Sequence, residues 1–494
     1  MDLKEKMKTL ECHFNWGIED IVGNIDDIMK KEVIKSEEFP NETWCGMLVE
    51  LNLAYELYKR NNRSEAEEKV KKCLKLFGNI NDNFFNEYKL AFKHVLLSLQ
   101  LFVNFDKSSE NDNKKLFNEI PAFSILSENE KTAIIGIKAY CFGEYGEQGR
   151  KHSLSLARKA HQDNPNEPEW CFMIGLALSR IRNYTHDNGI TDEEVNCIEK
   201  AYKLRKSSYF AVYLAQTYLD YTKMIRYQPS PEIAELSYSQ QNLKLQVYYR
   251  KAYQLFKEIA SRTDEKDVHI IVRCARGLFQ LKTLKPDLYD INEALIVLKK
   301  CLNIAPNYGM CHTLATSIYC ELHEYEQALK HSIKAKEIGD YFSSIRIIQL
   351  KCLLQQDVNA AETFDYMLKK HPTETYIYQT HLYAISYYIF KERNLQLAVK
   401  HFLIVSKLST MERQNYEIGD PWVKGRVDLC DIMYNEVRCA IDGRLYQNDE
   451  EKLKLEEAYE VFKSKYPDVT EKVTDSSLVE NLLSKNKKKW LQKC

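Results

Sequence analysis

The sequence predicts an all-α fold made of repeated pairs of helices. Only 16 Gly and 11 Pro interrupt the 494 residues, and long stretches place apolar side chains at helical rather than strand spacing. Short segments also recur. VKKCLKL at 70–76 is similar to LKKCLNI at 298–304, and EKAYKL at 199–204 is similar to RKAYQL at 250–255. One type of helix is therefore used several times.

The composition is that of a soluble globular protein. The chain has 70 Lys+Arg against 71 Asp+Glu, so it has no overall bias toward polyanions, and any nucleic-acid site must be a local patch. No apolar run is long enough for a signal peptide or a membrane span. We expect a soluble intracellular protein, located in the cytoplasm, without a membrane partner.

The N-terminal stretch LECHFNWGIED places Cys12 beside His13, which suggests a metal half-site, a nucleophile with its base, or simple packing. Adjacent residues on a helix point about 100° apart, and no second ligand pair lies nearby. The 14 cysteines of the chain include no CxxC, so free thiols are expected. We therefore predict a short helix that packs through Leu10, Phe14 and His13 and whose C-terminal end is formed by residues 15–17.

The repeat period is clearest after Pro306. In the 34 residues from Gly309, an aromatic residue at Tyr319 and small residues at Ala328 and Ala335 have the spacing of a tetratricopeptide helix-turn-helix. Similar pairs of small residues, seven apart, are Ala66/Cys73, Ala294/Cys301 and, more loosely, Ala398/Val405. Small side chains are needed where helices cross closely, so these cysteines are predicted to be structural.

A further unit is predicted to begin at Pro168, with Gly175 where two of its helices touch. Residues 106–115 and 183–192 are polar and turn-rich, which indicates loops. Residues 229–259 contain a proline only near their start and are predicted to form one long helix.

Three parts follow from this pattern. Residues 1–228 form an N-terminal tetratricopeptide-like subdomain, residues 229–410 form the long helix and a central repeat subdomain, and residues 411–494 form a C-terminal helical region with a basic tail. Helix pairs of this kind cannot bury their apolar stripes alone. We therefore expect them to stack into a solenoid, a superhelix with a concave groove or central channel.

Several segments resemble one known family in the same order. They are LECHFNW, the helix at 51–74, NPNEPEWCFMIGLALSRIR and SSYFAVYLAQTYLD. Together they resemble the interferon-induced proteins with tetratricopeptide repeats, the IFIT family, over 10–225 and more thinly to 410. In that family the Cys-His-Phe-x-Trp stretch is a structural signature, so the resemblance favours packing for Cys12 and His13.

The resemblance implies a positively charged channel that captures single-stranded RNA with a 5′-triphosphate or capped end. It implies a non-catalytic, antiviral protein of innate immunity, with other tetratricopeptide-repeat or translation-related proteins as further partners. It assigns phosphate or channel contacts to Arg182, Arg273 and Lys138. The chain differs from the family at Cys274, where the family has tyrosine, and at 312–314, where His-Thr-Leu replaces His-His-Gln.

The residues themselves point to a similar site. Arginines fall on the predicted first helices of two repeats, and the set is Arg180, Arg182, Arg273 and Arg276, flanked by Tyr209, Tyr213 and His312. A phosphate would stabilise an enclosed arginine by bidentate hydrogen bonds, and aromatic rings would stack on bases. For each arginine, an ion pair with a glutamate of a neighbouring repeat is the alternative. We predict that Arg182 and Arg273 point into one cavity, where replacement by Glu abolishes binding without unfolding the chain.

Two other kinds of function remain. A protein-binding scaffold would use the concave groove for a peptide or partner helix, and the near-neutral charge and altered family positions favour it. An enzyme is not expected: GEYGEQGRKHS at 143–153 lacks phosphate-loop spacing and is predicted to be a turn, and no cofactor motif is present. The tail at 484–494, with Lys487 to Lys489, is a cationic segment that could touch RNA phosphates or acidic lipid. The sequence gives no oligomeric state.

Overall fold

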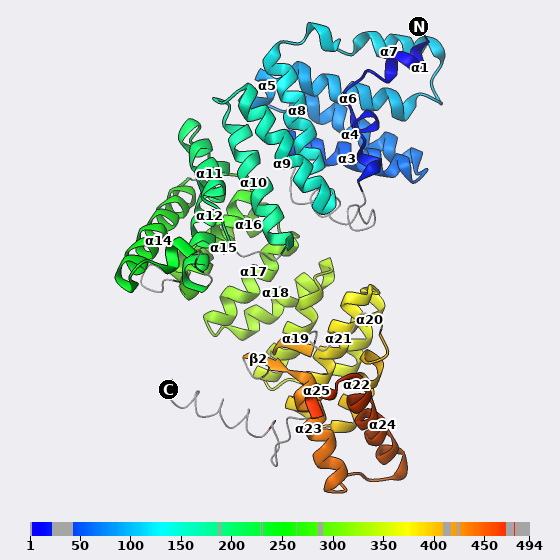
Figure 1. Cartoon of the computed structure of the whole chain (residues 1–494), viewed down its shortest axis with the longest axis vertical. Helices are drawn as coiled ribbons and strands as arrows, with labels where there is room; N and C mark the ends of the chain where they lie inside the picture. Colours follow the sequence, from blue (N-terminus) through cyan, green and yellow to red (C-terminus); the bar gives the residue numbers. More distant parts are fainter. Residues whose placement is uncertain are drawn as a thin grey trace. The chain divides into compact units, whose positions relative to one another are not determined.

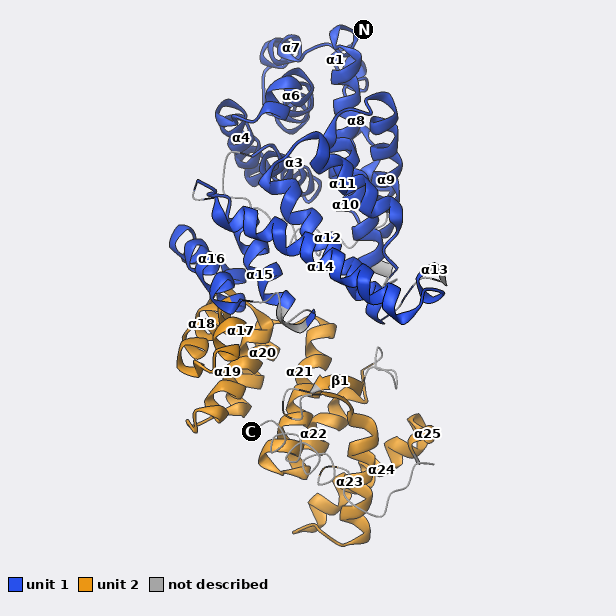
Figure 2. Cartoon of the chain, turned by 90° about the vertical axis from the view of Figure 1, so that its left-hand side faces the viewer, with its two compact units in different colours: residues 1–314 blue, residues 315–494 orange. Residues whose placement is uncertain are grey.

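The computed structural model describes residues 2–21, 43–185, 189–227, 229, 231–262, 264–284, 290–408, 416–420, 422, 425–470 and 479. The chain divides into two compact units, Met1–Leu314 and Ala315–Cys494 (Figure 2). Helices follow one another through both units, so the predicted all-α solenoid of tetratricopeptide type is confirmed (Figure 1).

The helices of unit 1 are α1 (Leu3–Met7), η1 (His13–Asn15), η2 (Ile18–Asp20), α3 (Trp44–Lys59), α4 (Arg63–Asn79), α5 (Asn83–Glu87), α6 (Lys89–Asn104), α7 (Glu110–Glu119), η3 (Phe123–Ile125), α8 (Glu128–Phe142), α9 (Gly146–Asp163), α10 (Pro168–Thr185), α11 (Asp192–Leu204), α12 (Ser208–Tyr227), α13 (Pro231–Ala234), α14 (Tyr238–Ser261), α15 (Val268–Leu284) and α16 (Ile291–Ile304). Within this unit α3 packs on α4, α8 on α9, α10 on α11, α12 on α14 and α15 on α16. Each pair is one repeat.

The chain passes from unit 1 into unit 2 within α17 (Gly309–Glu321). The elements that follow are α18 (Tyr325–Ile338), α19 (Tyr341–Leu353), α20 (Ala360–Lys370), α21 (Glu374–Tyr387), the π-helical turn η5 (Tyr388–Glu392), α22 (Leu395–Val405), β1 (Glu417–Asp420), β2 (Gly425–Asp428), α23 (Leu429–Asp442), α24 (Asp449–Lys465) and α25 (Pro467–Thr470). In the part of the chain that the structure describes, no helix is both long and apolar enough to cross a lipid bilayer.

The small residues of the repeat lie where the sequence analysis places them. The predicted pairs are all fully buried, and they are Ala66/Cys73, Ala294/Cys301, Ala328/Ala335 and Ala398/Val405. Gly175 on α10 faces α11 so closely that an added Cβ would lie 2.4 Å from the Ile198 side chain. These contacts confirm that small side chains permit the close crossing of paired helices.

The N-terminal segment differs from the single short helix predicted. It contains α1 and the short turn η1, which holds His13, and it ends at Gly17 with φ +72°. Only glycine adopts this left-handed backbone at little cost, so the chain turns there before η2. Leu10 therefore precedes the helical turn that carries Phe14 rather than sharing a helix with it.

Two predicted loops are partly helical. The second half of 106–115 lies in α7, because the Ser109 side chain accepts a hydrogen bond from the Asp112 amide and so caps a helix with an acidic first turn. Helix α10 continues to Thr185, so the first residues of 183–192 are helical as well. The turn predicted within 143–153 is shorter, since α9 already begins at Gly146.

The long helix predicted over 229–259 is interrupted. Helix α13 ends at Ala234, and α14 begins at Tyr238 after Ser237, whose side chain and Gln240 exchange hydrogen bonds with each other's backbone amides. This reciprocal cap satisfies free amide groups and starts a new helix.

The two compact units are also divided at a different place from the predicted parts. Helix α14 packs on α12, so helices on both sides of residue 228 belong to one unit, and the division between the units follows Leu314.

The C-terminal region contains one element that was not predicted. Strands β1 and β2 pair antiparallel, with Glu417 opposite Asp428 and Asp420 opposite Gly425. Glycines at 419 and 425 disfavour a helix here, and the strand pairing satisfies the backbone instead. The basic tail at 484–494 lies outside the described residues.

Candidate functional site

The predicted site residues all belong to unit 1. Lys138 is on α8, Arg180 and Arg182 are on α10, Tyr209 is on α12, Arg273 and Arg276 are on α15, and His312 is near the start of α17. Helices α8, α10, α12 and α15 are first helices of successive pairs, and α10 contacts α8 as α12 contacts α15. Equivalent helices of neighbouring repeats therefore present these side chains.

An aromatic and cationic group joins α12 to α15. The Tyr209 and Tyr213 ring centroids are 5.1 Å apart, and the Arg273 guanidinium carbon lies 4.7 Å from the Tyr213 centroid. The Arg273 Nε–H donates to His269 Nε2 over 2.8 Å, and the Tyr213 hydroxyl lies 3.0 Å from the same nitrogen. Both residues therefore converge on one imidazole.

Arg273 has no carboxylate partner within ion-pairing distance among the described residues, and its side chain is half-buried. Among the described residues its contacts are the Tyr213 ring and the His269 nitrogen, and neither engages the two terminal guanidinium nitrogens. A cation in this state attracts an anionic ligand more strongly than one already paired with a carboxylate.

Arg180 lies near the same tyrosines but is paired. Its Nη2 is 2.9 Å from Glu144, at the turn that follows α8. Burial disfavours the charge of Arg180, yet Glu144 and nearby tyrosines, including Tyr213 and Tyr209, raise its pKa above the ordinary value. Gly143 permits this position, because an added Cβ there would lie 2.7 Å from Arg180 Nη1. Arg180 thus remains a cation that Glu144 largely neutralises.

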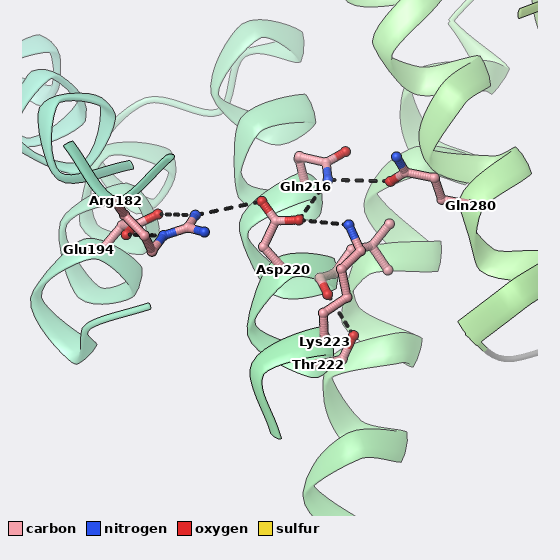
Figure 3. A network of polar contacts seen from close by, with 8 residues as sticks. Arg182, Glu194, Gln216, Asp220, Thr222, Lys223 and Gln280 are labelled. Carbon is pink, nitrogen blue, oxygen red and sulfur yellow. Dashed lines mark hydrogen bonds and ion pairs between the residues drawn. The ribbon is translucent and has the colours of Figure 1, made fainter. Parts of the chain in front are cut away.

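Arg182 is directed toward the second helix of its own repeat. Its Nε and Nη2 donate to Glu194 of α11 over 3.2 and 3.0 Å, and Nη2 is 3.7 Å from Asp220 of α12 (Figure 3). The Arg182 side chain is 12% exposed and the Glu194 side chain 2%. The sequence analysis gave an ion pair with a glutamate of a neighbouring repeat as the alternative to phosphate binding; the glutamate that pairs with Arg182 belongs to the same repeat instead.

The Asp220 carboxylate extends this network toward α15. It accepts hydrogen bonds from Gln216 at 3.1 Å and Lys223 at 3.0 Å, and Gln216 also donates to Gln280 of α15 over 3.3 Å (Figure 3). The structure thus places Arg182 in a polar network between helices and Arg273 on the aromatic group. It gives the two arginines different surroundings.

Lys138 is the second half-buried cation without a carboxylate partner among the described residues. Its ammonium lies 5.9 Å from the ring centroids of both Trp16 and Phe142. Burial and this ammonium together lower the pKa of the nearby His152. The N-terminal signature therefore contributes Trp16 to the surroundings of a predicted site residue.

The remaining predicted residues lie toward the end of unit 1. Arg276 is half-buried on α15 and acts electrostatically on Cys311. His312 is buried, and its Nε2 lies 2.8 Å from the Pro306 carbonyl oxygen, so it fixes the start of α17. Cys274, which replaces the tyrosine of the family, is fully buried, and its thiol donates to the Phe256 carbonyl of α14. That position therefore faces the packing between helices.

Sequence reasoning missed His269 and Glu144. His269 had a usable signal, because residues four apart share a helix face and Arg273 follows it by four. Glu144 had none, since only the approach of α8 to α10 brings its carboxylate to Arg180. Tyr213, noted from sequence only as a flanking aromatic, is the residue that contacts Arg273.

The question raised by Cys12 and His13 can now be answered. Both side chains are fully buried, and His13 Nε2 is 2.8 Å from Asn52 Oδ1. Burial raises the pKa of the Cys12 thiol to about 12 and lowers the pKa of His13 to about 4, so neither group is set up as a nucleophile or its base at neutral pH. The described residues contain no group of three or more side chains placed to hold a metal ion.

Comparisons with known proteins agree with this fold. No protein-family model matches the chain, and no curated protein sequence matches it significantly. Among solved structures, the chain is similar to a human IFIT1 dimer with m7Gppp-AAAA, at 14% identity and TM-score 0.54, over 95% of this chain and 98% of that chain. It is similar to a human IFIT1 dimer with PPP-AAAA at 13% identity and TM-score 0.55, over 95% and 97% of the two chains. A monomeric IFIT1 mutant with Gppp-AAAA is similar at 14% identity and TM-score 0.52, over 98% and 99%. At these identities the similarity shows the fold alone.

Proposed function

We propose that unit 1 captures single-stranded RNA carrying a 5′-triphosphate or capped end, and that it does so without turnover. The observation that carries the proposal is Arg273, a half-buried guanidinium held on Tyr213 and His269 without a carboxylate partner among the described residues. Its terminal nitrogens can donate two parallel hydrogen bonds to phosphate oxygens. The resemblance to the IFIT family extends the proposal to cytoplasmic antiviral defence.

The neighbouring side chains have the character that single-strand binding requires. Tyr209 and Tyr213 offer ring faces for bases, while Lys138 adds a cation without a carboxylate partner among the described residues. Stacking on aromatic rings tolerates any base, and cations track the phosphate backbone. The human IFIT1 complex with PPP-AAAA supports the choice of ligand, because its fold is similar to this one over nearly the whole chain.

Binding of matched RNAs with a 5′-triphosphate or a 5′-hydroxyl tests the proposal. We expect selective binding of the triphosphate RNA by fluorescence polarisation, and an Arg273→Gln loss of about ten- to hundredfold, as for one hydrogen-bonded charge. Arg158→Gln is the matched control, because it also removes one positive charge but from an exposed ion pair with Glu193. Equal and negligible binding of both RNAs by the unaltered protein would disprove the proposed function.

A protein-binding scaffold is the second candidate. Arg180 and Arg182 are already paired with Glu144 and Glu194, which leaves fewer available cations than an extended RNA backbone would engage. A peptide with one acidic group would need only Arg273. RNA binding should weaken steeply as salt rises, because counterions are released from the phosphates. A pull-down that is dominated by one protein, and unchanged by ribonuclease, would favour the scaffold.

A further inference from the structure

Two donors share a single acceptor beside the candidate site. The Arg273 Nε–H, 2.8 Å from His269 Nε2, is always protonated and can only donate. The same His269 nitrogen is 3.0 Å from the Tyr213 hydroxyl. A nitrogen that accepts a hydrogen bond from arginine does so through its lone pair, so His269 Nε2 carries no hydrogen. The Tyr213 hydroxyl therefore donates to the same nitrogen. The imidazole is therefore in the Nδ1–H form.

This arrangement fixes the direction of the arginine. The Nε–H donates to His269, and the guanidinium carbon lies over the Tyr213 ring, 4.7 Å from its centroid. These two contacts restrict the freedom of the long side chain. The end that carries the two terminal nitrogens is thereby presented for a ligand without a further loss of conformational entropy on binding.

We propose that His269 is the positioning residue of this site: as a neutral imidazole it orients Arg273 for a ligand phosphate. The proposal rests on the proposed function of unit 1. A proton on Nε2 would remove the acceptor for the Arg273 Nε–H, so the role requires the neutral ring.

Several charged and titratable groups lie around the imidazole. On its own helix these are Arg273 and the preceding Asp267, whose carboxylate accepts the His269 backbone amide at 2.9 Å. From α12 they are Tyr213 and, next to it, Tyr209. On α10, Arg180 lies near both tyrosines. The Asp267 carboxylate also accepts the Ile270 backbone amide and so caps the helix, while Arg273 is a charged group in direct contact with Nε2.

Two variants separate positioning from simple packing. His269→Gln retains an acceptor oxygen at about the place of Nε2 but cannot be protonated near neutral pH, whereas His269→Leu keeps bulk and removes the acceptor. At pH 7.5 we expect His269→Gln to bind 5′-triphosphate RNA nearly as the unaltered protein does, and His269→Leu to bind about tenfold more weakly, the effect of one hydrogen bond to a charged group. Far-UV circular dichroism and thermal unfolding of each variant identify any loss of fold.

Recovery of binding by His269→Gln is the decisive measurement. Weak binding of the triphosphate RNA by a folded His269→Gln, or full binding by a folded His269→Leu, would overturn the proposal.

A second measurement does not depend on RNA. Nitrogen-15 NMR of the histidine rings at pH 7.5 should show His269 with an unprotonated Nε2, and Arg273→Gln should shift that signal. A proton on Nε2 at this pH refutes the positioning role even if RNA binds. An unprotonated Nε2 in a protein that binds neither RNA would support the hydrogen-bond arrangement and reject the proposed function, so the two ideas fail separately.

Discussion

Replacing Arg182 by glutamine should loosen the α10–α11 pair. The Glu194 side chain is 2% exposed and depends on Arg182 for two hydrogen bonds. Removing one member of a buried ion pair costs about 3–5 kcal/mol, because the other charge stays buried. A hydrogen bond from Ser179 also lowers the pKa of Glu194 and remains in the variant, so we expect a loss near the lower value, about 3 kcal/mol.

The loss should depend on pH in a defined direction. Burial raises the pKa of Glu194, and Arg182 opposes that rise. Without Arg182 the pKa of Glu194 in the folded chain is higher still, so at pH values between the unfolded-state pKa and this higher pKa the folded chain binds a proton that the unfolded chain does not. Lowering the pH therefore protonates Glu194 and removes the cost of its buried charge. The difference in free energy of unfolding between the variant and the unaltered protein should be larger at pH 7 than at pH 5.

Native-state hydrogen exchange, followed by mass spectrometry, measures this locally. A loss of about 3 kcal/mol corresponds to roughly hundredfold faster exchange in peptides of α10 and α11, while peptides of α23 and α24 serve as the internal control. Adding Glu194→Gln to Arg182→Gln should restore much of the protection. Unchanged exchange in Arg182→Gln, combined with selective loss of 5′-triphosphate binding, would refute this reasoning and restore Arg182 as a phosphate ligand.

Three further outcomes follow from single contacts. Gly277→Ala should lower the thermal unfolding midpoint and cost about 1–3 kcal/mol of stability, because its Cβ would lie 2.0 Å from the buried Phe256 ring. Adding Phe256→Leu should recover part of the loss. An unchanged midpoint in Gly277→Ala would contradict the contact. Burial lowers the pKa of His13 to about 4, so its contribution to the free energy of unfolding is complete above about pH 6.5 and falls by about 2 kcal/mol at pH 5. Urea unfolding at both pH values measures this loss, and His13→Gln should not show it. Cys301 and Cys311, whose Sγ atoms are 2.8 Å apart, are fully buried, and the hydrogen bond with Cys301 together with burial raises the pKa of Cys311; both should therefore resist iodoacetamide in the folded protein and react only on unfolding, and rapid alkylation of either in the folded protein would contradict this packing.

Much of the architecture could be read from local pattern. The spacing of Tyr319, Ala328 and Ala335 identified a helix pair, and Gly175 identified a crossing point, because apolar periodicity and small residues act over one or two helical turns. Two incorrect predictions, the loop over 106–115 and the uninterrupted helix over 229–259, could have been avoided from local sequence signals. Ser109 and Ser237 each begin a helix with a side-chain cap, which marked α7 and the restart at α14 within the sequence itself.

The sequence by itself therefore determined the all-α repeat and the helices that carry the arginines. Only the tertiary structure showed which partners those arginines have: Arg182 forms an ion pair with the buried Glu194, whereas Arg273 contacts Tyr213 and His269. The reason is physical. A helix depends on neighbours three or four residues away, but the availability of a charge depends on burial and on counter-charges brought by other helices, and such distances exist only once the repeats have packed.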